Sequence, residues 1–294
     1  MKLLISGTTG FIGKNLVKRL LEEKHTVFTI VRPSSNPSSL EDSVTKFVFD
    51  GDMESLISFM QEEKIDGVIH LASLFLAGHK PDDIKGLIES NVLFGTQLLE
   101  ASVKAEIPWF INTGTFWQHY ENKKYSPVNL YAATKQAFED IAKYYTETSN
   151  INFVTIKLSD TFGPFDTRPK IFNLWTKISQ TKEKLGMSPG KQIIDISHID
   201  NITDAYLQLI KLLSEDKKNK LKNKSFAIHS NERVTLRKLS KIFEELSKTK
   251  LNINWGEKEY RLREVMKPWT GGDKIPGWKV SVKLRDGIKK MFNN

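Results

Sequence analysis

The chain has 294 residues, of which 39% are hydrophobic and 27% charged, with 17 Gly, 10 Pro and no Cys. This composition is typical of a globular protein, and the lack of cysteine excludes disulfides, thiolate nucleophiles and thiolate metal ligands. No apolar run approaches the ~18 residues that a membrane helix needs, and the apolar start breaks at residues 6–10. We therefore expect a cytoplasmic protein with no membrane partner.

Charge is unevenly divided along the chain. The formal net charge is +9, but residues 1–150 carry 15 Lys and Arg against 19 Asp and Glu (15 − 19 = −4), and residues 151–294 carry 29 against 16 (29 − 16 = +13). An anionic ligand is thus expected to meet the second half. Only 8 of the 44 basic residues are Arg, the side chain that nucleic-acid surfaces favour, so we expect no nucleic-acid partner.

Short apolar runs alternate with helical patterns through the first half of the chain. The predicted strands are residues 3–5, 27–31, 47–49, 68–71, 109–111 and 153–158. The predicted helices are residues 13–24, 54–63, 83–105 and 130–146. This alternation predicts an α/β fold with a doubly wound parallel sheet, of the Rossmann type, and helices on both faces.

The regular alternation stops after Gly163-Pro164. In the second half we predict helices at 170–179, 200–213 and 236–246 and strands at 193–197 and 225–228. Residues 1–164 are expected to form the first domain and residues 165–294 a smaller α/β substrate domain. Part of the segment 193–228 is expected to return to the first domain.

A glycine-rich loop, Gly7-Thr8-Thr9-Gly10-Phe11-Ile12-Gly13, lies between the first predicted strand and helix. Glycine suits a tight turn in which a pyrophosphate approaches the backbone N–H groups of a helix N-terminus. The pattern alone is weak, but its place between strand and helix predicts a dinucleotide-binding domain; the alternative is a glycine turn without a ligand. We expect cofactor contacts from Gly7, Thr9, Gly10, Phe11, Ile12 and Gly13.

The residues after the next two strands bear on the choice of cofactor. Arg32 follows the second strand, where an NAD site usually offers a carboxylate. A guanidinium there favours the 2′-phosphate of NADP, with NAD and a plain surface role for Arg32 as alternatives. Asp52 and Met53, just past the third strand, are expected beside the adenine. The alternative for Asp52 is a helix cap.

Tyr131 and Lys135 are four residues apart on the predicted helix 130–146, and so lie on one face. A tyrosine hydroxyl titrates near ~10, and a nearby ammonium and a nicotinamide cation would lower that pKa. Lys135 would also hold the cofactor ribose. Thr115, at the end of the fifth strand, is expected to orient a substrate oxygen, with Thr113 as second choice. The plain alternative is a helix Tyr followed by a Lys one turn later.

The same Tyr-x-x-x-Lys pattern occurs at Tyr120 and Lys124, in a polar segment without apolar periodicity. We therefore favour Tyr131 as the reactive phenol.

These motifs together resemble the extended short-chain dehydrogenase/reductases, and among them the nucleotide-sugar epimerase/dehydratase family. The resemblance covers nearly the whole chain. It includes Val68-Ile69-His70-Leu71-Ala72-Ser73, Asn91 with Gly95-Thr96, Phe162-Gly163-Pro164 and Gly190-Lys191-Gln192-Ile193-Ile194-Asp195. It implies further cofactor contacts from Leu71, Ala72, Ser73 and Asn91.

Within the family the chain is similar to 4-ketoreductases of the CDP-abequose and CDP-paratose synthase type. Residues 117–120, 168–170 and 277–279 contribute to this likeness. It implies NADPH-dependent reduction of a 4-keto group on a nucleotide-diphosphate deoxysugar, a CDP-sugar in the first place, with Tyr131 as the proton donor. It also implies a homodimer formed through the helix 83–105 and the Tyr131 helix.

Two positions depart from the family pattern. Ile194 stands where the family has an Arg on the diphosphate, and Asp160 stands where relatives often have Asn beside the substrate. A carboxylate repels a diphosphate unless it is paired, so we expect compensating positive charge nearby. The expected substrate-binding residues are Thr115, Asp160, Arg168, Lys170 and Arg261.

Other functions were weighed against ketoreduction. An NAD-dependent epimerase that oxidises and re-reduces one carbon is the main alternative, and a catalytically silent cofactor-binding regulator is the second. A dehydratase is disfavoured because Gly114 and Phe116 flank Thr115, where dehydratase relatives carry Asp-Glu. The six histidines form no metal-binding pattern, so no metal is expected. His70 is predicted to be a core residue. His79 and His119 are expected to be solvated loop residues, with contact to the sugar as the alternative.

Overall fold

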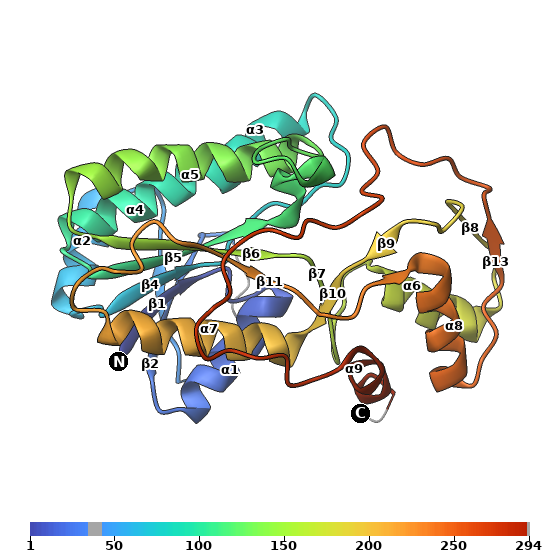
Figure 1. Ribbon diagram of the computed structural model, residues 1–294. Coiled ribbons are helices and arrows are strands. Elements are labelled where there is room, and N and C mark those ends of the chain that lie inside the picture. The colour runs from blue at the N-terminus through green and yellow to red at the C-terminus, as the bar shows by residue number, and fades with distance from the viewer. Residues whose placement is uncertain (35–42, 293–294) are drawn as a thin grey trace.

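Seven parallel strands form the central sheet of the computed structural model, which describes residues 1–34 and 43–292 (Figure 1). Their spatial order is β11-β6-β5-β4-β1-β2-β3. The strands are β1 (Lys2–Ser6), β2 (Thr26–Val31), β3 (Thr45–Val48), β4 (Gly67–His70), β5 (Trp109–Thr115), β6 (Asn152–Leu158) and β11 (Ser225–Ile228). The predicted doubly wound parallel sheet is therefore confirmed.

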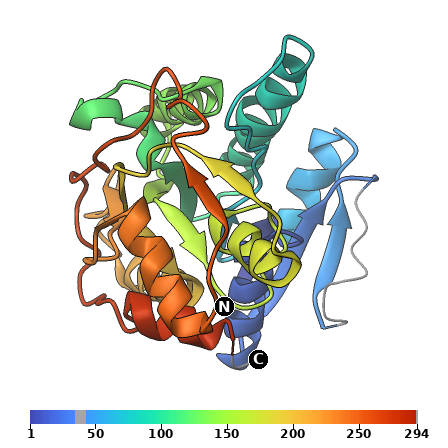
Figure 2. The same ribbon diagram turned by 90° about the vertical axis from the view of Figure 1, so that its right-hand side faces the viewer.

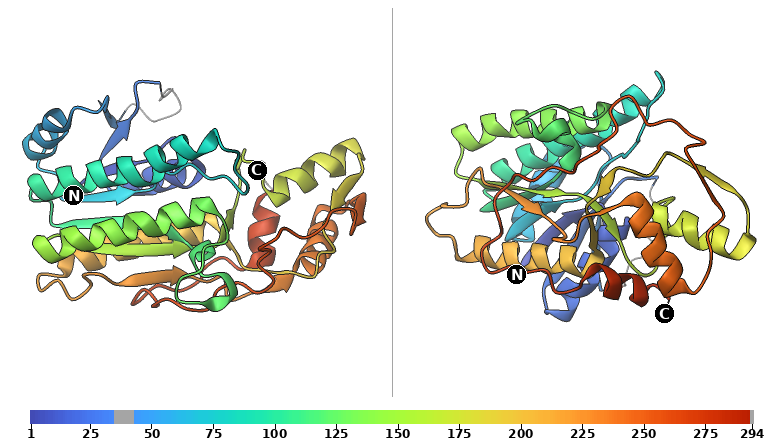
Figure 3. Two further views of the ribbon diagram at one scale, coloured as in Figure 1. Left: turned by 90° about the horizontal axis from the view of Figure 1, so that it is seen from above. Right: turned by 45° about the vertical axis from the view of Figure 1, so that its right-hand side comes forward.

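Helices cover both faces of this sheet (Figure 3). On one face lie α1 (Phe11–Glu22) and α7 (Ile199–Glu215), and on the other α2 (Met53–Glu62), α4 (Phe94–Lys104) and α5 (Leu130–Thr148). Strands such as β4 and β6 are buried along their whole length, as expected where helices cover both faces of a parallel sheet. The predicted helix 83–105 consists of α3 (Asp83–Ile88), a π-helical turn (Glu89–Leu93) and α4.

A smaller part lies beyond the carboxyl ends of the strands (Figure 2). Its helices are α6 (Ile171–Thr181), α8 (Leu236–Ser247) and α9 (Leu284–Lys290). Its strand pairs are β7 (Asp160–Phe162) with β10 (Ile196–His198), β9 (Ile193–Ile194) with β12 (Val234–Thr235), and β8 (Leu185–Met187) with β13 (Ile253–Trp255). The predicted strand 193–197 is two strands, because buried Asp195 interrupts it. Strands of two or three residues carry too little alternation to be predicted, and α9 was also missed.

Residues 199–228 lie within the layers of the main sheet. Helix α7 packs against α1, and β11 pairs in parallel with β6. The domain boundary after residue 164 remains a prediction.

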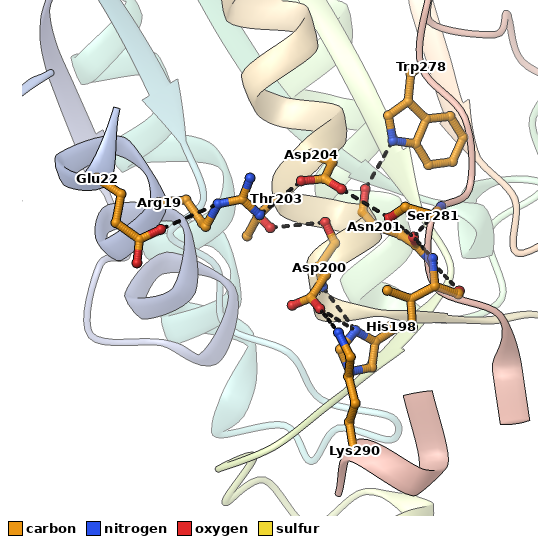
Figure 4. Close-up of polar contacts among 11 residues, drawn as sticks. Arg19, Glu22, His198, Asp200, Asn201, Thr203, Asp204, Trp278, Ser281 and Lys290 are labelled. Carbon is orange, nitrogen blue, oxygen red and sulfur yellow. Dashed lines mark hydrogen bonds and ion pairs between the residues drawn. The ribbon is translucent and has the colours of Figure 1, made fainter. Parts of the chain in front are cut away.

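The C-terminal segment is fixed to α7 (Figure 4). The Asn201 side-chain oxygen accepts hydrogen bonds from the backbone N–H groups of Ser281 and Val282, both at 2.9 Å. The Trp278 indole donates to the Asn201 carbonyl at 3.1 Å. Between β13 and these contacts, the chain returns to β11, where Asp273 bridges to Phe226. This return path carries Arg261 and Trp269 to the carboxyl end of the sheet.

Candidate active site

The glycine loop joins β1 to α1 and fits a pyrophosphate. Gly7 has a φ of +78°, and a Cβ there would lie 2.6 Å from the Ala72 nitrogen; a Cβ on Gly13 would lie 2.2 Å from the Gly7 oxygen. These two positions require glycine. Gly10 caps α1 without a side-chain hydrogen bond. The first N–H groups of the helix are thus left for an anionic ligand.

The loop after β4 lies beside the glycine loop at the point where the strand order reverses, the usual ligand position in such sheets. The Ser6 hydroxyl accepts a hydrogen bond from the Ala72 N–H at 3.2 Å and contacts His70 Nδ1 at 2.8 Å. His70 is fully buried, as predicted for a core residue. Burial and the charge of Lys135 lower its pKa to about 3.

Asn91 connects this loop to α5. Its side chain is fully buried and is hydrogen-bonded to Ser73, to both backbone groups of Leu74 and to Thr134. Asn91 therefore positions Ser73, and its direct contact with a cofactor stays a prediction.

Of the residues expected at the adenine end of the cofactor, Arg32 and Asp52 are exposed and Met53 is partly buried. Arg32 is exposed after β2. Asp52 is the N-cap of α2, where its carboxylate accepts hydrogen bonds from the N–H groups of Glu54 and Ser55 at 3.1 and 3.3 Å. The capping alternative for Asp52 is therefore what the structure shows. Met53 is the first residue of α2. The adenine contacts of Asp52 and Met53 stay predictions.

Helix α5 brings Tyr131 and Lys135 into one pocket with Thr115. Asn129 caps the helix by accepting a hydrogen bond from the Ala132 N–H at 3.0 Å. Thr115 is the last residue of β5, and its side chain and that of Ser73 hydrogen-bond with Tyr131. Ser73, Thr115, Tyr131 and Lys135 all line the pocket. Thr113 instead pairs with the Tyr206 hydroxyl at 2.6 Å, so Thr115 is the better placed threonine.

The charge states of this group suit proton donation by the phenol. Desolvation raises the pKa of Tyr131 to about 12, and the nearby Asp160 carboxylate raises it further, against the hydrogen bonds from Ser73 and Thr115. Burial lowers the pKa of Lys135 to about 8, against the attraction of Glu139. At neutral pH the phenol is protonated and the ammonium is charged. Without a bound cofactor, burial therefore holds the Tyr131 pKa above its usual value, and its lowering by the ammonium and a nicotinamide cation stays a prediction.

The expected substrate residues line the same pocket, with their charges already paired. Lys170 contacts Asp160 at 3.1 Å, and Arg261 contacts Glu264 at 3.0 Å. Arg168 is held by Asp166 and by Thr161, and its guanidinium lies 4.4 Å from the centre of the Phe11 ring. All of Thr115, Asp160, Arg168, Lys170 and Arg261 face this pocket, as does Ile194.

The sequence profile of the NAD dependent epimerase/dehydratase family matches residues 3–223. The chain belongs to this family. The resemblance inferred from its motifs is therefore confirmed, and the protein is an enzyme of the epimerase/dehydratase type.

Curated relatives match this epimerase/dehydratase along almost all of its length. The CDP-abequose synthase of Salmonella muenchen is 24% identical over 295 residues, covering 99% of this chain and 97% of that protein. The CDP-abequose synthase of Yersinia pseudotuberculosis is 26% identical over 269 residues, covering 91% and 92%. The predicted likeness to synthases of this type is thus confirmed.

Solved structures show the same fold. A UDP-glucose 4-epimerase from Thermotoga maritima, in complex with UDP-glucose, superposes with a TM-score of 0.87 at 21% identity, covering 100% of this chain and 98% of that one. A UDP-glucuronic acid 4-epimerase from Bacillus cereus, in complex with UDP-glucuronic acid and NAD, gives 0.85 at 23% identity, with coverage of 100% and 98%.

Several pocket residues of this epimerase/dehydratase were not predicted from the sequence. Phe75 lies 5.0 Å from the Tyr131 ring, centre to centre, and Trp269 stacks on His119 at 3.9 Å. His119 is buried and contacts the Lys157 ammonium at 2.9 Å. The interpretation of His119 as a solvated loop residue is therefore wrong. The aromatic residues at 116, 117 and 120 were the feature of the sequence that could have indicated a buried position for His119.

Tyr120 also lines the pocket that holds Tyr131 and Lys135, and the choice of Tyr131 as the reactive phenol stays a prediction. Tyr120 begins a short 3-10 turn and His79 is exposed. Within residues 1–34 and 43–292, the structure brings no three His, Cys, Asp or Glu side chains into a metal-binding group. The helices of these segments are too short or too polar to cross a membrane.

Proposed function

We propose that this enzyme uses NADPH to reduce a 4-keto group on a nucleotide-diphosphate deoxysugar. Among the possible nucleotides we favour CDP. The observation that carries the proposal is that Thr115, Tyr131 and Lys135 line one pocket, with Tyr131 and Lys135 one helical turn apart on α5. The same pocket is lined by Ile12 of the glycine loop and by Lys170 and Arg261. Full-length similarity to CDP-abequose synthases supports the sugar class.

Each side chain of the site has a separate role in the proposed reaction. The chemistry that NADPH would supply when bound is a hydride for the carbonyl carbon. Thr115 orients the carbonyl oxygen, and Tyr131 donates its proton to that oxygen. Lys135 holds the cofactor ribose, and its positive charge stabilises the phenolate that remains on Tyr131. The glycine loop binds the pyrophosphate of the cofactor.

The ion pairs made by Lys170 and Arg261 are compatible with binding of the substrate diphosphate by these two side chains. Lys170 and Arg261 would share their positive charge between a phosphate and their present partners, Asp160 and Glu264. Arg168, held from two sides, would act mainly by shaping the pocket.

An NAD-dependent epimerase is the second candidate, favoured by the UDP-sugar epimerases that share the fold. Epimerisation begins with removal of a proton from a sugar hydroxyl, which needs a tyrosine that ionises easily. We rank the epimerase second because the curated relatives that match along almost the whole chain are CDP-abequose synthases.

The test incubates the purified protein with NADPH and a CDP-linked 4-keto-dideoxyhexose. We expect one NADPH oxidised for each sugar reduced, with slower turnover of the UDP- and dTDP-linked sugars. Interconversion of sugars without net cofactor change would establish the epimerase instead. Tight cofactor binding with no turnover of any nucleotide sugar would establish the silent regulator.

Arg32→Ala should weaken the preference for NADPH. A hydrogen bond between a guanidinium and a phosphate contributes ~1.5–3 kcal/mol, so the ratio of kcat/KM for NADPH over NADH should fall by ~10–100-fold. Steady-state kinetics with both cofactors measures this, with Lys18→Ala, an exposed lysine on α1, as the control. An unchanged ratio in Arg32→Ala would show that another group reads the 2′-phosphate.

We also propose that the enzyme is a homodimer. Ile84, Ile88 and Leu93 are 43–50% exposed along the α3–α4 helix, and Tyr144 on the adjacent α5 is 64% exposed. Apolar side chains on two neighbouring helices support a helical interface between two copies. Sedimentation equilibrium would measure the mass directly.

A further inference from the structure

A group of largely buried polar side chains adjoins Thr115 and Lys135, and the reaction described above does not use it. Its centre is Glu139, one helical turn beyond Lys135 on α5, with a side chain that is 15% exposed. Glu139 does not line the pocket. We therefore expect its carboxylate to act on a ligand only through its neighbours.

Gln118 connects Glu139 to Thr115. Gln118 is fully buried, and its amide nitrogen donates hydrogen bonds to Glu139 at 2.9 Å and to the Gln136 side-chain oxygen at 2.8 Å. Its amide oxygen accepts a hydrogen bond from the Thr115 backbone N–H at 2.8 Å. Because a carboxylate can only accept hydrogen bonds, Glu139 fixes the direction of the Gln118 amide and keeps its oxygen on Thr115.

Glycine at position 114 makes room for this contact. A Cβ on Gly114 would lie 2.9 Å from the side-chain oxygens of both Gln118 and Glu139. Such an approach is closer than packed atoms allow, so a side chain there would displace one of the two.

The second oxygen of the Glu139 carboxylate has a buried cationic partner. The Lys157 ammonium lies 3.3 Å from this oxygen, and the Lys157 side chain is 5% exposed. The ammonium also lies 2.9 Å from His119 Nε2. Burial and the charge of Lys157 lower the pKa of His119 to about 4, so the histidine is neutral at pH 7. Both oxygens of the carboxylate are thus bonded.

The charge of Glu139 also acts on Lys135. Desolvation lowers the pKa of Lys135 to about 8, against the attraction of Glu139. His70 on β4 and Tyr131 on α5 are uncharged at pH 7, because burial lowers the pKa of His70 to about 3 and raises that of Tyr131 to about 12. Glu139 therefore supplies the charge that favours the ammonium form of Lys135.

We propose that Glu139 is a positioning residue for the ketoreduction, and the inference rests on that proposed function. Through Gln118, Glu139 holds the backbone of Thr115, so that the threonine hydroxyl stays beside the Tyr131 phenol. Its negative charge keeps Lys135 protonated for the cofactor ribose. One carboxylate on α5 thus fixes the end of β5 relative to the helix that carries the phenol.

The test compares Lys157→Met with the double variant Glu139→Gln/Lys157→Met. Both lack the ion pair, so no ammonium is left buried without a partner, and they differ only in the charge at position 139. NADPH affinity, measured by fluorescence titration in the absence of sugar, should weaken above about pH 8 in the wild type, where Lys135 loses its proton. The midpoint of this change should not fall in Lys157→Met. It should fall by about one pH unit in the double variant.

Activity tests the link to Thr115. At about pH 6, well below the Lys135 pKa, Lys135 is protonated in both variants, so a difference in kcat there reports positioning. We expect kcat for reduction of the 4-keto sugar to be ~10-fold lower in the double variant than in Lys157→Met, because a small displacement of a reacting group costs up to ~100-fold. Glu147→Gln, the same substitution at an exposed position on α5, is the control and should change neither quantity.

Three outcomes would contradict these proposals in different ways. Equal affinity midpoints in the two variants, or a midpoint lowered as far by Lys157→Met alone, would overturn the assignment of the charge effect to Glu139. Equal kcat values at the lower pH would show that Thr115 is held without Glu139, and would overturn the positioning role. No NADPH oxidation with any nucleotide sugar would overturn the ketoreduction, while the affinity titration would still decide whether Glu139 keeps Lys135 charged.

Discussion

Replacing Tyr131 by phenylalanine should lower kcat for ketone reduction by ~10²–10⁴-fold, the usual contribution of a general acid. The substitution removes one hydroxyl, which hydrogen-bonds with Ser73 and Thr115, and leaves the ring packed against Phe75. Binding of NADPH should change little, since Lys135 and the glycine loop remain. The measurements are steady-state NADPH oxidation and cofactor titration on the same preparation.

Tyr145→Phe provides a matched control on the same helix. Its phenol also has a pKa raised to about 12, by desolvation and by Glu100, but it does not line the pocket. Its removal should leave kcat unchanged. If Tyr131→Phe retains a rate within a few-fold of the wild type, the proton comes from another group and the proposed mechanism is wrong.

Local features of the site were predictable from the sequence because each follows from neighbouring residues. Gly7 and Gly13 are required by a turn between a strand and a helix. Tyr131 and Lys135 share a helix face because α5 begins at Leu130, after the Asn129 cap. Such features depend on a few consecutive positions, and the structure reproduces them almost residue by residue.

Features that depend on the tertiary fold were not predictable. Trp269 reaches His119 only because the C-terminal segment returns across the end of the sheet. The same limit applies to charge. The second half carries a net +13 (29 − 16), yet Arg168, Lys170 and Arg261 each contact a carboxylate in the pocket region. A count of charges along the chain does not reveal such pairs, which decide how much positive potential reaches a ligand.

Lys135→Met should abolish most of the activity and at the same time stabilise the fold. The Lys135 side chain is 1% exposed, and burial lowers its pKa from 10.5 to about 8. Keeping the ammonium charged in the folded protein at pH 7 therefore costs roughly 3 kcal/mol, at 1.36 kcal/mol per pKa unit. Methionine has a similar shape and no charge to bury. Glu139 is not left alone by the change, because Lys157 remains at 3.3 Å.

The pH dependence identifies the cause of this stabilisation. Between about pH 8 and pH 10.5 the unfolded wild-type chain keeps the Lys135 proton while the folded chain loses it, so wild-type stability rises with pH in this window. The advantage of Lys135→Met is thus full below pH 8 and shrinks towards pH 10.5. Denaturant unfolding at pH 7 and pH 10 measures both values, with Lys143→Met, an exposed lysine on α5, as the control. A variant less stable than wild type at pH 7 would show that favourable contacts in the folded protein stabilise the Lys135 ammonium. The proposal that this charge is buried at a cost in stability in order to bind the cofactor ribose and stabilise the Tyr131 phenolate would then be wrong.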